Sequence, residues 1–556
     1  MGDYKEISAV AQKRRDDALS AFFPIPEIGE ESLPNDLRSY PQTSGLLTPE
    51  ELEVVNSDAE TLLKKIKART LTSVQATTAF CKAAAIAQKL TNCVTEVLFN
   101  EGLERARYLD DYLERTGEVV GPMHGLPFSL KDNFMTPPYP SSIGMAVHAN
   151  TPTEKPSVLV TMLRDLGAVF YVKTNIPTAM MMGETTNRIW GETRNPIHKG
   201  LTPGGSSGGE GALIAMKASP LGVGTDIAGS IRIPGACCRL YGLKPSFGRF
   251  STWGGKPSIP GQDFIYAVCG PMSPSLGGVK LFCESVLSDA AAPWNLDPKI
   301  IPMPWRKDVI QPKGRKLRFG VLGANDGMIT CHPPVERGLA IVTQALKGAG
   351  HDVVPWEPAS HKEIVDLLNE SFDELGSDAI IPQLEAYKEP LFGSMERAFS
   401  ACKNNAGKFN PERLREMITK RNILQKEYLD RWMATKTETG GPIDGIIAPV
   451  APTGAPRLGL GDKVDYVGFT GFVNLLDFPA CTFPVTYADK SLDPPRGEGW
   501  APLSEKDAMI QADYDPEFYH GGPVSLQLIG KRLEEEKVVE MVEVVADVLS
   551  SAELAN

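Results

Sequence analysis

The sequence lacks the long apolar runs, paired cysteines and basic excess that mark several large protein classes. No apolar run approaches 18 residues, so neither a membrane-spanning helix nor a membrane anchor of that kind is expected. The nine cysteines form no C-x-x-C pair, which argues against a zinc knuckle or a disulfide framework and favours a reducing, cytoplasmic compartment. Acidic residues (69) outnumber basic ones (57), and the net charge of -12 disfavours nucleic acid and anionic membranes as partners.

Two further absences narrow the chemistry of the glycine- and serine-rich segment 202–250. It has no Gly-Lys step, so it is not the phosphate-binding loop of an NTPase. Neither of its serine loops, GGSSGGEGA at 204–212 and TDIAGSI at 225–231, contains any of the seven histidines. The string G-S-S-G-G matches the nucleophile elbow of α/β-hydrolases, but that elbow follows an apolar strand and needs a histidine partner. An esterase with a Ser–His–Asp triad is therefore a distant alternative.

The patterning that is present predicts a layered α/β architecture. Residues 1–50 predict a helical and irregular N-terminal arm, and helices continue to about residue 115, with Thr48 and Thr72 as N-caps. From residue 119, short apolar strings alternate with helical stretches, as in layered α/β proteins. The strand-like strings include GLPFSLKDNF, GAVFYVKTNIP, LRFGVLG, GIIAPVAPTGAP and GPVSLQLIG. Helices are expected over 333–435 and a long loop over 487–521.

The serine loops and one lysine are the candidates for chemistry. Glycines around a serine allow several N–H groups to point at one oxyanion, although a Gly/Ser run by itself is most simply a flexible loop. Lys131 is flanked by apolar residues, and such a lysine is most simply a surface group with a buried stem. A role as a base requires burial that lowers its pKa from about 10.4 to about 7, at a cost of roughly 4–5 kcal/mol. Proteins carry that cost mainly at working sites.

Together these residues and their spacing resemble the motifs of a known protein family. Lys131, Ser206 and Ser230 are separated by 75 and 24 positions, and their strings closely resemble those of the amidase-signature family. The resemblance extends from about residue 50 to 545 and includes KTNIPTAM, NLLDFPA and VSLQLIG. The N-terminal arm and the string DIAGSIRIP are most similar to the fungal acetamidase branch. The resemblance implies one α/β domain at 51–550, with a large central mixed β-sheet flanked by helices.

The resemblance also implies a serine amidohydrolase that needs no metal or cofactor. Ser230 would attack the amide carbonyl and form an acyl-enzyme that water then hydrolyses. Ser206, held by a cis peptide bond to Gly205, would pass protons between Ser230 and the neutral amine of Lys131, the ultimate base. The oxyanion hole would consist of the backbone N–H groups of Ile227, Ala228, Gly229 and Ser230.

The remaining assignments each have a plainer interpretation. By resemblance the supporting residues are Ser207, Asp226 and Arg232, and the substrate-binding residues are Met180 and Ser206. Asp226 and Arg232 are equally well explained as a structural ion pair. Met180 is equally a core residue, because methionine is an adaptable core side chain. Many relatives have glycine where Ala228 stands; its methyl group narrows the acyl pocket but keeps the N–H donor.

The expected partner is a small-molecule amide, and relatives cut aliphatic, aryl and fatty-acid amides as well as carbamates. Trp190, Phe134 and the 487–521 segment are further candidates for the pocket wall. Relatives often pair, so a homodimer is the assembly that the resemblance suggests. An amidotransferase subunit that supplies ammonia within a complex shares these motifs and is the main alternative. A binding protein on an inactive amidase scaffold is a third hypothesis.

Overall fold

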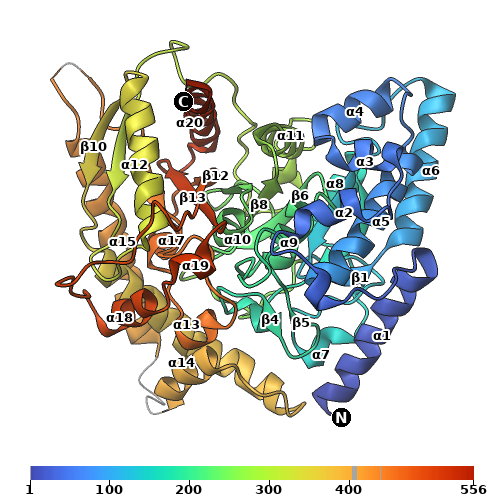
Figure 1. The fold of residues 1–556 in the computed structure, drawn as a ribbon, viewed down its shortest axis with the longest axis horizontal. Helices are drawn as coiled ribbons and strands as arrows, with labels where there is room; N and C mark the ends of the chain where they lie inside the picture. The colour runs from blue at the N-terminus through green and yellow to red at the C-terminus, as the bar shows by residue number, and fades with distance from the viewer. Residues whose placement is uncertain (1, 404–409, 439, 556) are drawn as a thin grey trace.

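The centre of the molecule is one large sheet, in a computed structural model that describes residues 2–403, 410–438 and 440–555 (Figure 1). Eleven strands run across it in the order β1 (Val94–Val97), β3 (Val169–Thr174), β2 (Pro127–Lys131), β6 (Gly222–Asp226), β8 (Val268–Ser273), β7 (Tyr241–Lys244), β12 (Ala480–Tyr487), β13 (Pro523–Ile529), β11 (Gly445–Pro449), β9 (Arg318–Leu322) and β10 (Asp352–Trp356). The pairs β2–β3, β2–β6, β9–β10 and β9–β11 are parallel and the other pairs are antiparallel, so the sheet is mixed. The predicted α/β fold is confirmed.

Helices flank the sheet along its whole length. They are α1 (Tyr4–Phe22), α2 (Tyr40–Thr43), α3 (Pro49–Asn56), α4 (Ala59–Lys67), α5 (Ser73–Thr91), α6 (Phe99–Thr116), α7 (Ala146–Ala149), α8 (Val158–Asp165), α9 (Gly208–Ala215), α10 (Arg232–Cys237), α11 (Leu276–Val286), α12 (Pro333–Gly348), α13 (His361–Glu385), α14 (Gly393–Lys403), α15 (Pro411–Ala434), α16 (Leu460–Lys463), α17 (Gly468–Leu475), α18 (Glu505–Ala512), α19 (Pro516–Tyr519) and α20 (Glu535–Ala555). Short 3-10 turns occur at Glu30–Ser32, Leu37–Ser39, Thr178–Met180 and Pro293–Asn295, and β4 (Thr186–Asn187) pairs with β5 (Gly191–Glu192). Figure 1 shows α3–α6 beside β1 at one end of the sheet and α12 and α15 beside β10 at the other.

Local signals in the sequence explain several of these boundaries. Thr48 and Thr72 both form capping boxes, in which the threonine side chain and the side chain three residues later satisfy each other's backbone N–H groups. Two predictions were wrong in detail. The short strands β1 and β10 interrupt stretches that were predicted to be helical, because pairing with β3 and β9 outweighs local helical preference. The 487–521 segment is not a continuous loop, since it contains α18 and α19.

The N-terminal helix is held against the body by buried polar contacts. Arg14 forms an ion pair with Glu96 at 2.6 Å, and the Glu96 side chain is only 2% exposed. The Ser8 hydroxyl donates a 2.7 Å hydrogen bond to the carbonyl of Ile189. Burial raises the pKa of Glu96 to about 7, and Arg14 opposes that shift. Helix α1 therefore packs on β1 and α7, while a domain boundary near residue 50 stays a prediction.

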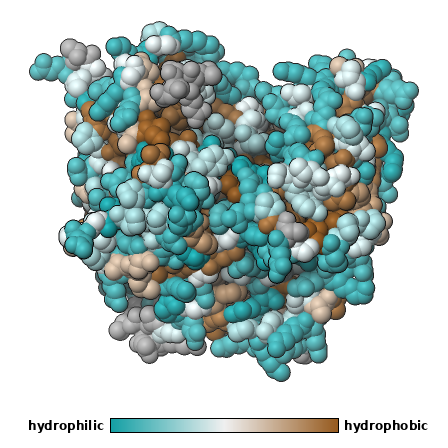
Figure 2. Space-filling view, viewed as in Figure 1, coloured by the Kyte–Doolittle hydropathy of each residue, from teal (hydrophilic) through white to brown (hydrophobic). Residues whose placement is uncertain are grey.

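Hydrophilic residues cover most of the face seen in Figure 2, with apolar side chains visible mainly in recesses. Among the described residues, no helix has the length and apolar character needed to cross a membrane. The apolar residues form one large cluster that contacts much of the central sheet, together with several smaller clusters.

The sheet topology sets the position of the site. Strands β2 and β6 are parallel neighbours, and parallel neighbours end at the same edge of a sheet. Lys131 is the last residue of β2 and Asp226 is the last residue of β6. The two serine loops lead into the short helices α9 and α10 at this edge. Residues that are far apart in the sequence thus meet where these two strands end.

Candidate active site

Lys131 is wholly buried, with 0% of its surface exposed. Its Nζ lies 2.7 Å from Ser206 Oγ and 2.7 Å from Thr225 Oγ1. Burial lowers the pKa of Lys131 to about 7, and the carboxylates of Asp226 and Glu210 oppose that shift only in part. A substantial fraction of this amine is therefore neutral near pH 7 and able to accept a proton.

The first serine loop holds Ser206 over this amine. The Gly205–Ser206 peptide bond is cis. A Cβ at Gly205 would lie 2.6 Å from the carbonyl oxygen of Met182, so only glycine fits there. Ser206 is 2% exposed, whereas Ser230 is partly exposed. Lys131, Ser206 and Ser230 thus lead from the protein interior toward the surface.

The Ser206 and Ser230 hydroxyls are not hydrogen-bonded to each other among the contacts of the described residues. The loops are joined instead through the backbone N–H of Ser207, which donates to the carbonyl of Ser230 at 3.2 Å. The Ser207 hydroxyl also donates a long, 3.4 Å bond to the carbonyl of Thr225. Ser207 therefore connects the two loops, and its predicted support of Ser206 stays a prediction. In unliganded enzymes such catalytic contacts are often long and shorten when substrate binds.

A buried ion pair holds the second serine loop. Asp226 and Arg232 are both 0% exposed and lie 3.1 Å apart. Burial by itself would raise the pKa of the Asp226 carboxyl, but the Arg232 guanidinium keeps it well below its usual range. Asp226 also accepts hydrogen bonds from the Gly229 N–H at 2.8 Å and the Asn474 amide at 2.8 Å. The pair is thus structural and at the same time shapes the loop that carries Ser230.

This loop lines a pocket with Ile227, Ala228 and Ser230, whose backbone N–H groups belong to the predicted oxyanion hole. Gly229 has φ +131°, and a Cβ there would lie 2.5 Å from Thr470 Oγ1, so the position requires glycine. The Gly229 N–H is already bound to Asp226, which removes it from the predicted set of four donors. In the described part of the chain, the other three backbone N–H groups donate to no other group; they are those of Ile227, Ala228 and Ser230.

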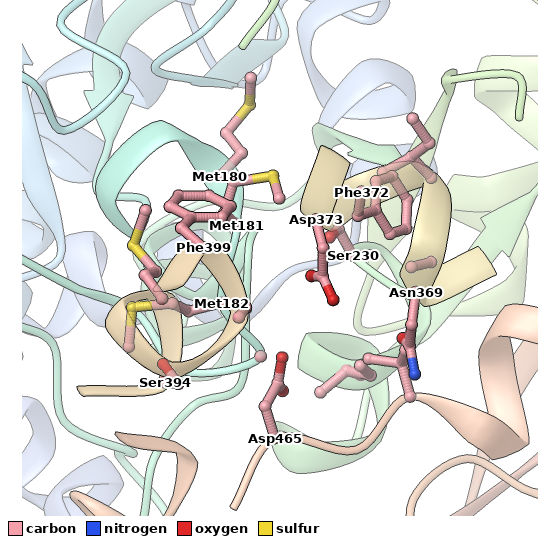
Figure 3. Close-up of a pocket in the computed structure, with 18 residues that line it drawn as sticks. Met180, Met181, Met182, Ser230, Asn369, Phe372, Asp373, Ser394, Phe399 and Asp465 are labelled. Atoms are coloured by element: carbon pink, nitrogen blue, oxygen red, sulfur yellow. The ribbon is translucent and has the colours of Figure 1, made fainter. Parts of the chain in front are cut away.

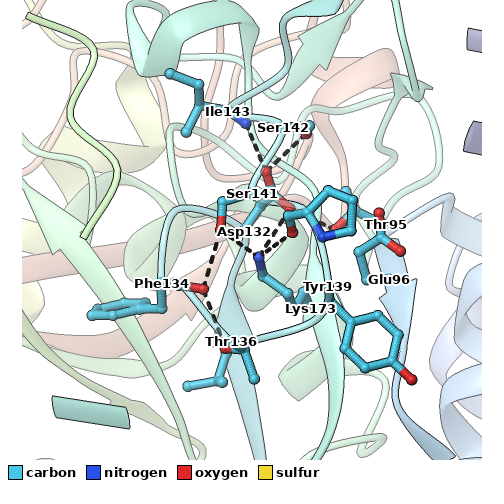
Figure 4. A network of polar contacts seen from close by, with 12 residues as sticks. Thr95, Glu96, Asp132, Phe134, Thr136, Tyr139, Ser141, Ser142, Ile143 and Lys173 are labelled. Carbon is cyan, nitrogen blue, oxygen red and sulfur yellow. Dashed lines mark hydrogen bonds and ion pairs between the residues drawn. The ribbon is translucent and has the colours of Figure 1, made fainter. Parts of the chain in front are cut away.

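The chain that follows Lys131 is fixed by a second buried network (Figure 4). Lys173 and Asp132 are both 0% exposed, and the Lys173 Nζ lies 3.7 Å from an Asp132 carboxylate oxygen. Lys173 donates to Ser141 Oγ at 2.7 Å. Asp132 accepts from Ser142 Oγ at 2.8 Å and Thr95 Oγ1 at 3.0 Å. Burial lowers the pKa of Lys173, and its amine binds the carbonyl of Pro140 and the hydroxyl of Ser141.

A pocket opens beside Ser230 (Figure 3). Its apolar lining includes Met180, Met181, Met182, Phe372 and Phe399. Met180 thus lines the pocket as the resemblance implies. Ser206 is buried and does not line it, although its neighbour Gly205 does. Trp190 and Phe134 do not line it: both are buried elsewhere, with Trp190 bonded to Ser142. No described residue of 487–521 contributes to the wall.

Sequence reasoning missed four residues of the site. Thr225 is the second partner of the Lys131 amine, and Glu210 is buried nearby, where it accepts a 2.7 Å hydrogen bond from Thr174 Oγ1. Asn474 and Gln527 bind Arg232 at 2.5 and 2.9 Å. The sequence did contain a signal for Asn474 and Gln527, because Asn474 opens the family-like string NLLDFPA and Gln527 lies within VSLQLIG. Among the described residues, no group of three or more His, Cys, Asp or Glu side chains is placed to hold a metal ion.

Comparison with known proteins agrees with this arrangement. A family model described as Amidase matches residues 75–539. The chain is 41% identical over 516 residues to an acetamidase of Emericella nidulans and 40% identical over 514 residues to an acetamidase of Aspergillus oryzae, with 92% of each chain covered. Its structure is similar to that of a protein named fatty acid amide hydrolase, with a TM-score of 0.90, 31% identity, and coverage of 98% of this chain and 95% of that one. The chain therefore belongs to the amidase-signature family and is an amide-hydrolysing enzyme.

Proposed function

We propose that this enzyme cleaves a carboxamide into a carboxylic acid and ammonia or an amine, through an acyl-enzyme on Ser230 and a Ser–Ser–Lys relay. The observation that supports it most directly is a buried lysine amine with a lowered pKa, 2.7 Å from the hydroxyl of Ser206. A lysine in water is almost wholly protonated at pH 7 and is a poor base. A buried lysine with a lowered pKa is the form in which an amine serves as a general base.

In the proposed first step, the Ser230 oxygen attacks the amide carbon as its proton passes to Ser206, whose own proton passes to Lys131. The negative charge that develops on the carbonyl oxygen is stabilised by the free N–H groups of Ile227, Ala228 and Ser230. Ser206 then protonates the departing nitrogen and recovers a proton from Lys131. The C–N bond breaks, and the acyl group stays on Ser230.

In the second step water attacks the acyl-enzyme. One proton of that water passes through Ser206 to Lys131. As the ester bond to Ser230 breaks and the acid is released, the proton returns from Lys131 through Ser206 to the Ser230 oxygen. Substrate bound in the pocket brings the Ser230 and Ser206 hydroxyls into hydrogen-bond contact. Each residue ends the cycle in the protonation state in which it began.

The pH profile tests the role of Lys131. Because only the neutral amine accepts a proton, kcat/KM should fall below the Lys131 pKa of about 7. At pH 5 it should be ~100-fold lower than on the plateau above pH 8, since one proton is involved.

The free energy of unfolding should also rise with pH. Unfolding restores the ordinary pKa of 10.5 to the Lys131 amine, so the penalty for burying this amine is largest below pH 7 and disappears as pH rises to 10.5.

Glu210 is the control for this assignment, because burial raises its pKa to about 7 as well. The Glu210→Gln variant should keep an inflection near pH 7, as measured by initial rates and with circular dichroism to verify folding. A kcat/KM that is flat from pH 5 to 8 in the wild type, or an inflection that disappears in Glu210→Gln, would contradict the role of Lys131.

The reaction itself is tested with a panel of amides, esters and carbamates of graded acyl size, with the released amine or ammonia measured. The relatives named acetamidase favour short aliphatic amides at the start of that panel. The purified chain alone should hydrolyse at least one simple amide. Amide hydrolysis that appeared only after a partner protein was added would favour the alternative, an amidotransferase subunit.

A further inference from the structure

The pocket beside Ser230 contains two carboxylates. Asp373 lies on α13 and Asp465 lies in the loop before α17, 92 residues later in the chain, and both line the same pocket as Ser230. Figure 3 shows the two carboxylates directed into the open space between them, with Ser230 behind Asp373. The proposed relay uses neither of them.

Within the described part of the chain, neither carboxylate forms an ion pair. No lysine, arginine or histidine nitrogen among the described residues lies within the 4.0 Å of an ion pair with Asp373 or Asp465. Two cations lie nearby and both bind backbone carbonyls. Lys506 Nζ donates a 2.9 Å hydrogen bond to the carbonyl of Asp465. Arg397 donates to the carbonyls of Asp462 and Lys463, at 2.6 and 2.8 Å. Charged side chains that leave bulk water are normally paired. Two unpaired carboxylates in a substrate pocket therefore suit a cationic ligand.

The electrostatics of the pair agree with this geometry. Burial, and to a smaller extent the neighbouring Asp465, raise the pKa of Asp373 to about 6. Burial also raises the pKa of Asp465. A bound cation would favour the ionised form of each carboxylate and would so oppose these upward pKa shifts.

A separate observation also points to a polar ligand. The Ser394 hydroxyl oxygen is buried and has no hydrogen-bond partner among the described residues, and Ser394 lines the same pocket. Buried polar atoms are normally hydrogen-bonded, so an unpartnered one in a pocket marks a position for a ligand donor. In Figure 3 Ser394 and Asp465 both lie in the lower half of the view, below Met180, Met181 and Phe399. An apolar wall thus adjoins a polar, acidic region.

We propose that Asp373 and Asp465 select amides that carry a protonated amine, with the ammonium group held at this acidic pair and the intervening methylene groups packed against the methionine and phenylalanine wall. This proposal rests on the amide hydrolysis proposed above for Ser230. Asp373 and Asp465 are specificity-determining residues in it and take no part in the proton relay.

The experiment uses linear primary amides that end in an ammonium group, with about three to five methylene groups between that group and the carboxamide. Each is compared with its neutral isostere, in which a methyl group replaces the ammonium. At pH 7.5, wild-type kcat/KM should favour the ammonium substrate by about tenfold or more at one chain length, as expected of a close charge pair. In the Asp373→Asn/Asp465→Asn double variant the preference should disappear, with the neutral isostere changed by less than about threefold. The control is Asp366→Asn, on the same helix but exposed and paired with Lys362, which should keep the wild-type preference.

Equal kcat/KM for ammonium and methyl substrates at every length in the wild type, or an undiminished preference in the double variant, would overturn the proposal. Should the double variant not fold, the single variants and inhibitors that mimic the ammonium end of the substrate replace it. In that case n-pentylamine should inhibit wild-type hydrolysis of a neutral amide more strongly than n-pentanol does. Hydrolysis of the neutral isosteres separates the two questions. If they are hydrolysed without any preference for the ammonium partner, only the acidic-pair proposal fails; if no amide is hydrolysed, the proposed function fails.

Discussion

Replacing Ser230 by alanine is expected to lower kcat for a simple amide by a factor of ~10⁴ to 10⁶ while leaving the protein folded. The reason is that the acyl-enzyme cannot form without this oxygen. Ser206→Ala and Lys131→Met interrupt the same proton relay, so each should be severely impaired. Because the three residues act as one unit, the triple variant should be scarcely slower than Ser230→Ala alone.

The measurements are steady-state rates and labelling with a serine-directed phosphonate, followed by mass spectrometry. The wild type should be labelled at Ser230 only, and Ser230→Ala should not be labelled. Ser39→Ala, an exposed serine on the N-terminal arm, is the matched control and should keep full activity and labelling. A Ser230→Ala enzyme with wild-type rates, or a wild type labelled at a different serine, would remove Ser230 from the mechanism.

Replacing Asp226 by alanine is expected to reduce the free energy of unfolding by about 3–5 kcal/mol. The variant leaves the guanidinium of Arg232, 0% exposed, without its countercharge. It also removes the acceptor for the Gly229 and Ile231 N–H groups, at 2.8 and 3.1 Å. Since that loop carries Ser230, any folded fraction should also have much lower kcat.

Denaturant unfolding and the thermal midpoint measure this effect. Asp17→Ala is the matched control, because Asp17 forms an ion pair with Lys13 in which the side chains are 65% and 73% exposed. Such exposed pairs contribute about 0–1 kcal/mol, so this control should be close to the wild type. If both variants lost the same free energy of unfolding, burial of the Asp226–Arg232 pair would not govern its contribution to stability.

Features that depend on residues close in the sequence were predicted better than features that depend on distant ones. The caps at Thr48 and Thr72 join residues three positions apart, and both threonines were predicted as N-caps. Strand β1 and strand β10 have only four and five residues, and their conformation depends on partners elsewhere in the chain, so local patterning predicted helix there. Helix α18 was missed although Ser504 caps it, because the surrounding segment is rich in proline and glycine.

By itself the sequence determined the kind of chemistry available. It contains two serines, each preceded by a glycine, and one lysine in apolar surroundings, at spacings typical of amidases. Residue identities and short-range backbone requirements are sufficient for that. Only the tertiary structure decided that the Lys131 amine is buried against Ser206 and Thr225, because its pKa depends on desolvation by distant segments. The tertiary structure likewise decided the character of the pocket, since Asp373 and Asp465 meet beside Ser230 only after α13 and the loop before α17 pack around it.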